Sequence, residues 1–177
     1  MPDGSFLNSQ ASTGNGHSAS ELAKEYLDRG WQPVALQAEE KHPIAKGWQH
    51  REVTPEDVPS YFADPNGNVG VRLGDASGGL VDLDLDCPEA RALADKLLPA
   101  TNCVFGREST PRSHWLYRVA GACSTKRYEV AGEGALVELR GNGSQTMLPG
   151  SVHPSGETVT FANDGEPAEQ DAEQLDS

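Results

Sequence analysis

The sequence predicts one folded domain with an αβ first half and a mostly β second half. Helical patterns occur only before Pro99, and short apolar runs separated by Gly or Pro fill the chain after it. The chain has 177 residues, which suits one domain, and its 19 Gly and 12 Pro suit many turns and short elements.

In the first half, helices and strands alternate. A helix is expected over 20–29, with Ser20 as its cap and Gly30 as its end. A second helix begins near Thr54, whose hydroxyl is followed by a proline and two acids. A third helix, over 88–98, is amphipathic. The strands expected between these helices are 31–36, 69–73 and 80–85.

After Pro99 only strands are expected. They are 102–105, 114–119, 135–140, 145–148 and 158–161. Residues 1–18 are rich in Ser, Gly and Asn without periodicity, which is typical of a disordered leader. Residues 162–177 hold six acids and no base, which suggests an acidic tail or linker. The folded part is therefore expected to span 19–161.

The net charge of -13 argues at first sight against a nucleic-acid partner. The charge is uneven, however, because six bases face only four acids between Arg107 and Arg140. No apolar run approaches the roughly 20 residues of a membrane span, and the first twenty residues do not resemble a secretory signal. The three cysteines form neither a disulfide framework nor a metal knuckle, which favours a reducing cytoplasm.

Three aspartates alternate with apolar residues around the strand expected over 80–85. Asp82, Asp84 and Asp86 therefore share one face of that strand. Their like charges repel one another, and a divalent cation such as Mg²⁺ or Mn²⁺ would offset that repulsion. The alternative is a solvated edge strand with its polar side facing water.

Two further segments could complete a site with these acids. Glu138 and Arg140 share a face of the strand expected over 135–140, and Glu138 could supply the third carboxylate of a two-metal site. His114 begins another strand close to Arg107 and Arg112, and these donors could hold a triphosphate. Solvent exposure of the glutamate and a structural role for the histidine are the alternatives.

An ordered series of short motifs extends over 22–161. The series is Tyr26-Leu27, Gly30-Trp31, Lys41-His42-Pro43, Lys46-Gly47-Trp48, Asn68-Val69-Gly70-Val71, Ser77-Gly78-Gly79-Leu80, Asp84-Leu85-Asp86, the His114 strand, Val137-Glu138-Leu139-Arg140-Gly141 and Pro149-Gly150-Ser151-Val152-His153-Pro154-Ser155-Gly156. In this order the motifs resemble the N-terminal primase-polymerase domain of bifunctional replication proteins, within the archaeo-eukaryotic primase superfamily. The resemblance implies an α+β fold. An αβ N-terminal module and an RRM-like C-terminal module would surround a central mixed sheet, with the site in the cleft between them.

The resemblance also implies roles for individual residues. Asp84, Asp86 and Glu138 match the family's metal-binding acids, whereas Asp82 falls where the family usually has an apolar residue and is left out of the metal set. The family often has Ser two positions before the nucleotide-binding histidine, where this chain has Arg112. The residues expected to bind nucleotide are His114, Ser113, Arg107, Arg112, Arg140, Ser151 and His153. A turn-closing role for His153 is the alternative, and no structural zinc is expected.

The function implied by the resemblance is that of a DNA primase and DNA polymerase. Such a template-dependent nucleotidyltransferase makes or extends primers in the replication of a plasmid, phage or mobile element. It would use a two-metal Mg²⁺ or Mn²⁺ site, single-stranded DNA and nucleoside triphosphates in the cytoplasm, away from membranes. A helicase, in the same chain or separate, would be its partner. The alternatives are an inactive nucleotide- or template-binding module and a two-metal nuclease.

Overall fold

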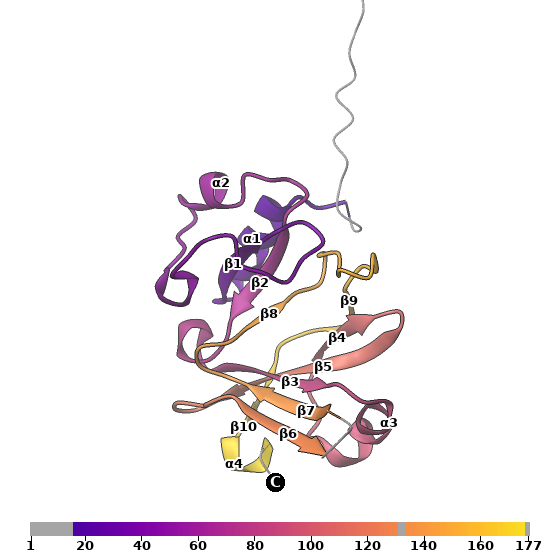
Figure 1. The fold of residues 1–177 in the computed structure, drawn as a ribbon. Coiled ribbons are helices and arrows are strands. Elements are labelled where there is room, and N and C mark those ends of the chain that lie inside the picture. Colours follow the sequence, from indigo (N-terminus) through magenta and orange to yellow (C-terminus); the bar gives the residue numbers. More distant parts are fainter. Residues whose placement is uncertain (1–15, 131–133, 176–177) are drawn as a thin grey trace, which may run out of the picture.

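The computed structural model describes residues 16–130 and 134–175 and has two β-sheets (Figure 1). Its elements in chain order are α1 (Ala19–Asp28), β1 (Gln32–Leu36), η1 (Trp48–His50), α2 (Val58–Tyr61), β2 (Asn68–Arg72), η2 (Asp75–Ser77), β3 (Leu80–Leu85), α3 (Pro88–Leu97), β4 (Cys103–Arg107), β5 (Thr110–Val119), β6 (Lys126–Val130), β7 (Gly134–Arg140), β8 (Gln145–Met147), β9 (Thr160–Asp164), β10 (Ala168–Gln170) and α4 (Ala172–Leu175). Most of the leader expected at 1–18 lies outside the described residues.

The first sheet has the strand order β1-β2-β8 and packs against helix α1. This helix begins earlier than expected, because Ser18 rather than Ser20 caps it. The Ser18 hydroxyl accepts from the backbone N–H of Glu21, and the Glu21 carboxylate accepts from the backbone N–H of Ser18 at 2.7 Å. The capping box directs the buried face of the helix, which includes Leu22 and Tyr26, onto the sheet.

The second sheet has the order β6-β7-β3-β5-β4-β9, and β10 lies beside β5. Every pairing in it is antiparallel except that of β10 with β5. After β7 the chain leaves this sheet and joins the first one as β8 (Figure 1). The α+β class is therefore confirmed, but two sheets replace the single central mixed sheet that was expected.

The two faces of the second sheet are covered differently. Side chains such as Leu83, Trp115 and Tyr117 pack on one face under α3 and α4. Their neighbours on the other face, including Phe105 and Leu116, join the core that holds α1 and the first sheet. This alternation follows from the two-residue period of a strand, and it places the face that carries Asp82 and Asp84 toward the first sheet.

The acidic stretch expected to be a solvated tail, 162–177, instead forms β9, β10 and α4 as far as Leu175. Strand β9 pairs with β4, and Leu175 is only 8% exposed within the core under the second sheet. The sequence pattern did not predict these elements, because short strands such as β9 and β10 and a four-residue helix such as α4 need few apolar residues. The acidic side chains of this stretch remain at the surface. Folding therefore extends well beyond residue 161.

The longest described helices, α1 and α3, have ten residues each. None of the helices in the described part of the chain has the length and apolar character needed to cross a membrane. Cys87, Cys103 and Cys123 form no disulfide with one another, and the last two are buried.

Replacing Leu175 by alanine should lower the free energy of unfolding by about 2 kcal/mol, because the change removes buried apolar contacts of α4. Leu97→Ala is the matched control, since that side chain is 72% exposed and should change stability by less than about 0.5 kcal/mol. Urea denaturation measures both. Equal effects of the two changes would show that the C-terminal segment does not belong to the core.

Candidate active site

Cross-strand pairing places three charged or ionisable side chains in one row across the second sheet. Asp84 of β3 lies opposite His114 of β5 on one side and opposite Glu138 of β7 on the other. Residues that lie directly opposite on neighbouring strands share a face, so the row points toward the first sheet. One step along, Asp82 lies opposite Arg140 on the same face. The row therefore brings the predicted Asp84, Glu138 and His114 together.

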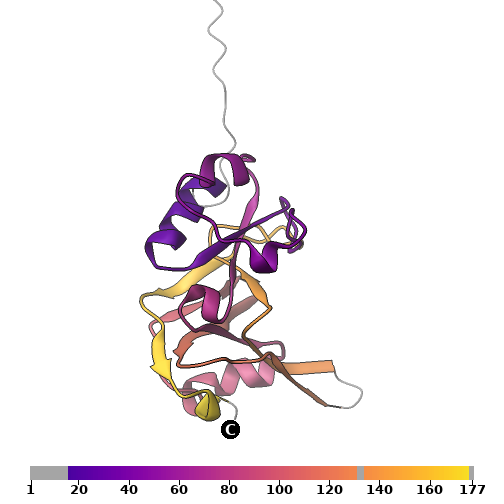
Figure 2. The ribbon, with the colours of Figure 1, turned by 90° about the vertical axis from the view of Figure 1, so that its left-hand side faces the viewer.

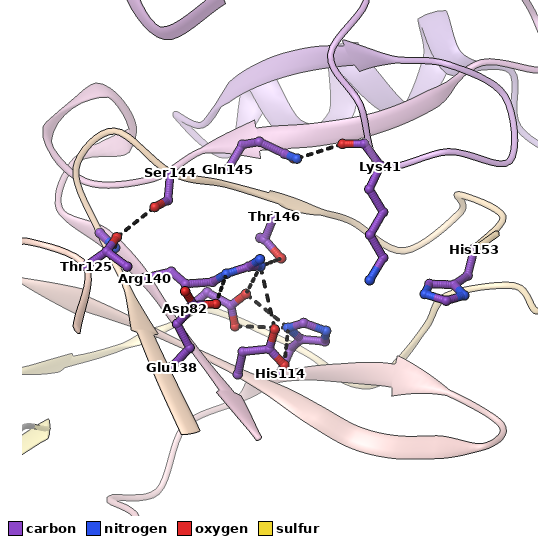
Figure 3. Close-up of polar contacts among 12 residues, drawn as sticks. Lys41, Asp82, His114, Thr125, Glu138, Arg140, Ser144, Gln145, Thr146 and His153 are labelled. Atoms are coloured by element: carbon purple, nitrogen blue, oxygen red, sulfur yellow. Dashed lines mark hydrogen bonds and ion pairs between the residues drawn. The ribbon is translucent and has the colours of Figure 1, made fainter. Parts of the chain in front are cut away.

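Asp82, which the sequence left out of the site, is fully buried at its centre, with 0% of its side chain exposed. One of its carboxylate oxygens lies 3.0 Å from Nδ1 of His114 and 3.7 Å from Nη1 of Arg140 (Figure 3). Thr146 on β8 lies near this carboxylate and helps to lower its pKa. Asp82 thus contacts both cationic side chains of the site and lies near a strand of the other sheet.

Arg140 is shared among three carboxylates. Its Nε lies 3.0 Å from Glu138, and its Nη1 lies 3.7 Å from both Asp82 and Asp84 (Figure 3). Buried or half-buried acids this close together would repel one another without a cation. One guanidinium therefore supplies the positive charge that lets the acids remain adjacent.

The charges of the site depend on one another. Burial alone would raise the pKa of Asp82, but His114 and Arg140 outweigh it and hold that pKa below its usual range. Burial also opposes the charged form of His114, yet the carboxylates of Asp82 and Asp84 outweigh burial and raise the pKa of the ring. Burial, with a contribution from Asp82, raises the pKa of Asp84. The shifts therefore favour the charged forms of both Asp82 and His114, and Asp84 accepts a proton more readily than Asp82 does.

A cavity of about 100 Å³ opens beside this network, between the two sheets. The second sheet contributes Asp84, His114 and Arg140, and the loops beside the first sheet contribute Lys41 and His153 (Figure 3). Burial, reinforced by neighbouring positive charges, lowers the pKa of His153. Cationic and imidazole groups outnumber acids in the lining, so the cavity suits an anion with several oxygens, such as a phosphate chain.

Of the other residues predicted to bind nucleotide, two lie at the cavity and two lie away from it. Arg107 lies at the cavity, where its Nη1 is 2.9 Å from Nε2 of His153, and Ser113 lines the cavity as well. Arg112 instead forms a bidentate ion pair with Asp95 of α3 at 2.6 and 2.8 Å and lines a neighbouring hollow.

Ser151 is the second predicted residue that the structure keeps away from the cavity. It is fully buried, and its hydroxyl donates to the carbonyl of Val69 and accepts from the N–H of Val69. Both hydrogen-bonding capacities are thus used by the backbone of β2. A serine in a Pro/Gly-rich loop gave no sign of this, because the neighbouring strand is remote in sequence.

The predicted metal-binding acids are only partly gathered. Asp84 and Glu138 are cross-strand neighbours, but Asp86 is exposed just beyond the end of β3. Within residues 16–130 and 134–175, no group of three or more His, Cys, Asp or Glu side chains is arranged to hold a metal ion. The carboxylate donors have the chemistry that Mg²⁺ or Mn²⁺ requires, and a cation bound between them would take over the neutralising role of Arg140.

The family model described as bifunctional DNA primase/polymerase, N-terminal (Prim-Pol) matches residues 23–173. The chain belongs to the Prim-Pol family. A search of curated proteins found no match. Membership indicates a nucleotidyltransferase of the primase/polymerase type. The matched range also includes β9 and β10, in agreement with a fold that continues beyond residue 161.

Sequence reasoning missed three features of this Prim-Pol site. Asp82 could have been included, because its alternation with Asp84 already places both on one face. No pattern in the sequence indicated that Thr146 would lie at the site. Asn68 is buried and joins two loops of the cavity wall: its Nδ2 donates to the carbonyls of Glu40 and Val152, and its Oδ1 accepts from the N–H of Val152. These loops carry Lys41 and His153.

Asn68→Ala should lower the free energy of unfolding by about 2 kcal/mol, because it leaves partly buried backbone groups of two loops without their partner. The exposed Asn66, two residues earlier, provides the control, and Asn66→Ala should have little effect. Thermal and urea denaturation test both variants. A stable Asn68→Ala protein would show that the loops are held by other contacts.

Proposed function

We propose that this Prim-Pol domain is a template-dependent nucleotidyltransferase that makes primers, extends them, or both. The single observation that supports this most directly is the row of Asp84, Glu138 and His114 across the second sheet, beside a cavity lined by cations. Acids on one side and phosphate-binding groups on the other are what transfer of a nucleotide requires.

In the proposed reaction, Asp84 and Glu138, together with Asp86 as the family resemblance implies, would hold Mg²⁺ or Mn²⁺. When bound, such ions supply activation of a 3′-hydroxyl and stabilisation of the leaving pyrophosphate. The acids themselves must be ionised and aligned, and Arg140 performs this alignment through its contacts with Asp84 and Glu138. The incoming hydroxyl attacks the α-phosphate, and pyrophosphate leaves.

The triphosphate would lie in the cavity between the sheets. His114 approaches it from β5, Arg107 from β4 and Lys41 from the opposite loop. Hydrogen bonds from charged donors to phosphate oxygens are stronger than neutral ones, and partial burial strengthens them further. His153, held by Arg107, completes the proposed lining.

We also propose that the second sheet contains the RRM-like module implied by the resemblance. The strand order β7-β3-β5-β4, with α3 between β3 and β4, supports this interpretation. The connection from β5 to β7 differs, because it contains strand β6 in place of a second helix.

The biological setting is a further part of the proposal. We propose single-stranded DNA as template and nucleoside triphosphates as substrates, because the motifs resemble those of primase-polymerase domains. A helicase partner, replication of a plasmid, phage or mobile element, and action in the cytoplasm rest on the resemblance of the motifs alone.

The decisive experiment is synthesis by the purified chain on single-stranded DNA, with ribo- and deoxynucleotides supplied separately and with Mg²⁺ or Mn²⁺. New or extended strands would support the proposal. Nucleotide binding without synthesis would instead identify an inactive binding module. Shortening of labelled DNA without added nucleotides would identify a nuclease.

Asp84→Asn and Glu138→Gln should each reduce synthesis by more than about a hundredfold, because each removes a carboxylate that would hold metal. Burial already raises the pKa of Asp84, so a neutral amide there should leave the melting temperature unchanged or higher. Asp95→Asn, on the exposed surface of α3, is the control and should retain activity. Parallel losses of activity and stability would mean that these acids are structural.

His114→Gln should raise the apparent KM for nucleotide by tenfold to a hundredfold, because a charge-assisted hydrogen bond to phosphate contributes about 1.5–3 kcal/mol. Binding of single-stranded DNA, measured by fluorescence anisotropy, should change little. An unchanged KM and rate in a nucleotide titration would remove His114 from the proposed triphosphate site.

A further inference from the structure

Asp82 is a fully buried acid whose charged partners both face the cavity. Its two oxygens lie 3.0 and 3.3 Å from Nδ1 of His114, and one lies 3.7 Å from Nη1 of Arg140. A buried carboxylate is costly unless it is paired and hydrogen-bonded. Here both partners are side chains of the proposed triphosphate site, and both line the cavity that Asp82 itself does not reach.

The ring of His114 is fixed from two directions. Its Nδ1 faces Asp82, and its plane stacks on Phe105 with a centroid distance of 4.6 Å and an interplanar angle of 9°. The other ring nitrogen, Nε2, is consequently turned toward Lys41 and His153 (Figure 3). A carboxylate on one nitrogen of an imidazole determines both the orientation of the ring and the position of its proton.

Arg140 is fixed by acids on two strands. Asp82 and Glu138 contact its guanidinium from β3 and β7, and Thr146 of β8 lies 3.5 Å from its Nη1. Thr146 also helps to lower the pKa of Asp82. Asp82 therefore contacts both cationic side chains, His114 and Arg140, and lies where the second sheet approaches β8 of the first.

We propose that Asp82 is a positioning residue, which holds His114 and Arg140 in the orientation that binds the triphosphate of the incoming nucleotide. This inference rests on the proposed function of the cavity.

The proposal is testable because a positioning role and simple charge repulsion predict opposite effects of neutralising Asp82 on phosphate binding. A carboxylate repels phosphate through space, so neutralising an acid that is merely nearby should tighten phosphate binding. Neutralising a positioning acid should weaken it, because the cationic partners lose their orientation. Asp82→Asn and Asp84→Asn remove the same charge from one strand face, but Asp82 lies 3.0 Å from Nδ1 of His114 and Asp84 3.6 Å. The two variants therefore form a matched pair that separates loss of the hydrogen bond to His114 from loss of a nearby charge.

The experiment is calorimetric titration of the purified chain with inorganic tripolyphosphate in the absence of metal. We expect Asp82→Asn to weaken binding by about tenfold, within the range seen when supporting partners of a site are removed. Asp84→Asn should bind as well as the native chain or more tightly. Nucleotide titrations in the synthesis assay should show the same weakening for Asp82→Asn as a rise in KM that exceeds the fall in kcat.

A second readout is independent of catalysis. In ¹⁵N-edited NMR spectra the native chain should show a hydrogen-bonded Nδ1–H proton of His114, assigned by its disappearance in His114→Gln. The signal should shift or vanish in Asp82→Asn. If Asp82→Asn does not fold, the native spectrum alone still decides, because the absence of this proton would overturn the proposal.

The results of the tripolyphosphate titration and of the synthesis assay together distinguish a failure of the positioning role of Asp82 from a failure of the proposed function. Unchanged or tighter tripolyphosphate binding by Asp82→Asn, or no binding by the native chain, would overturn the positioning role. A native chain that neither makes nor extends primers, but binds tripolyphosphate in a manner dependent on Asp82, would remove the synthetic function and leave the positioning role supported.

Discussion

The buried charge of Asp82 constrains the centre of this molecule. A carboxylate with no access to water must be surrounded by donors and cations, and His114, Arg140 and Thr146 provide them from three different strands. Because β5 and β7 belong to the second sheet and β8 to the first, the groups around this one charge come from both sheets. The cavity lies where they meet.

The route of the chain makes that meeting possible. After β7 the backbone crosses from the second sheet to pair β8 with β2, so Arg140 and Thr146 come from adjacent segments of chain but different sheets. Figure 2 shows the first sheet above the second and the β6–β7 hairpin reaching out from the body. Loops held by Asn68 complete the cavity from the side of the first sheet.

Several features of the site could be predicted from local patterns. The alternation around Asp84 and the strand predicted at His114 identified side chains that the sheet brings together, although that strand, β5, begins at Thr110 rather than at His114. Arg112 and Ser151 were misplaced because their partners, Asp95 and the backbone of Val69, lie elsewhere in the chain. The acidic C-terminal stretch was misinterpreted because β9 and β10 acquire their stability from pairing with β4 and β5, not from their own composition.

The sequence by itself determined the α+β class, the face shared by the aspartates and, through the order of its motifs, the Prim-Pol family. These properties depend on residue periodicity and on spacing along the chain. Only the tertiary structure decided that the sheet is divided in two, that Arg140 is shared among three acids, and that Asp82 lies at the centre. The physical reason is that burial and charge compensation depend on neighbours from distant strands, and no local pattern records which strands will become neighbours.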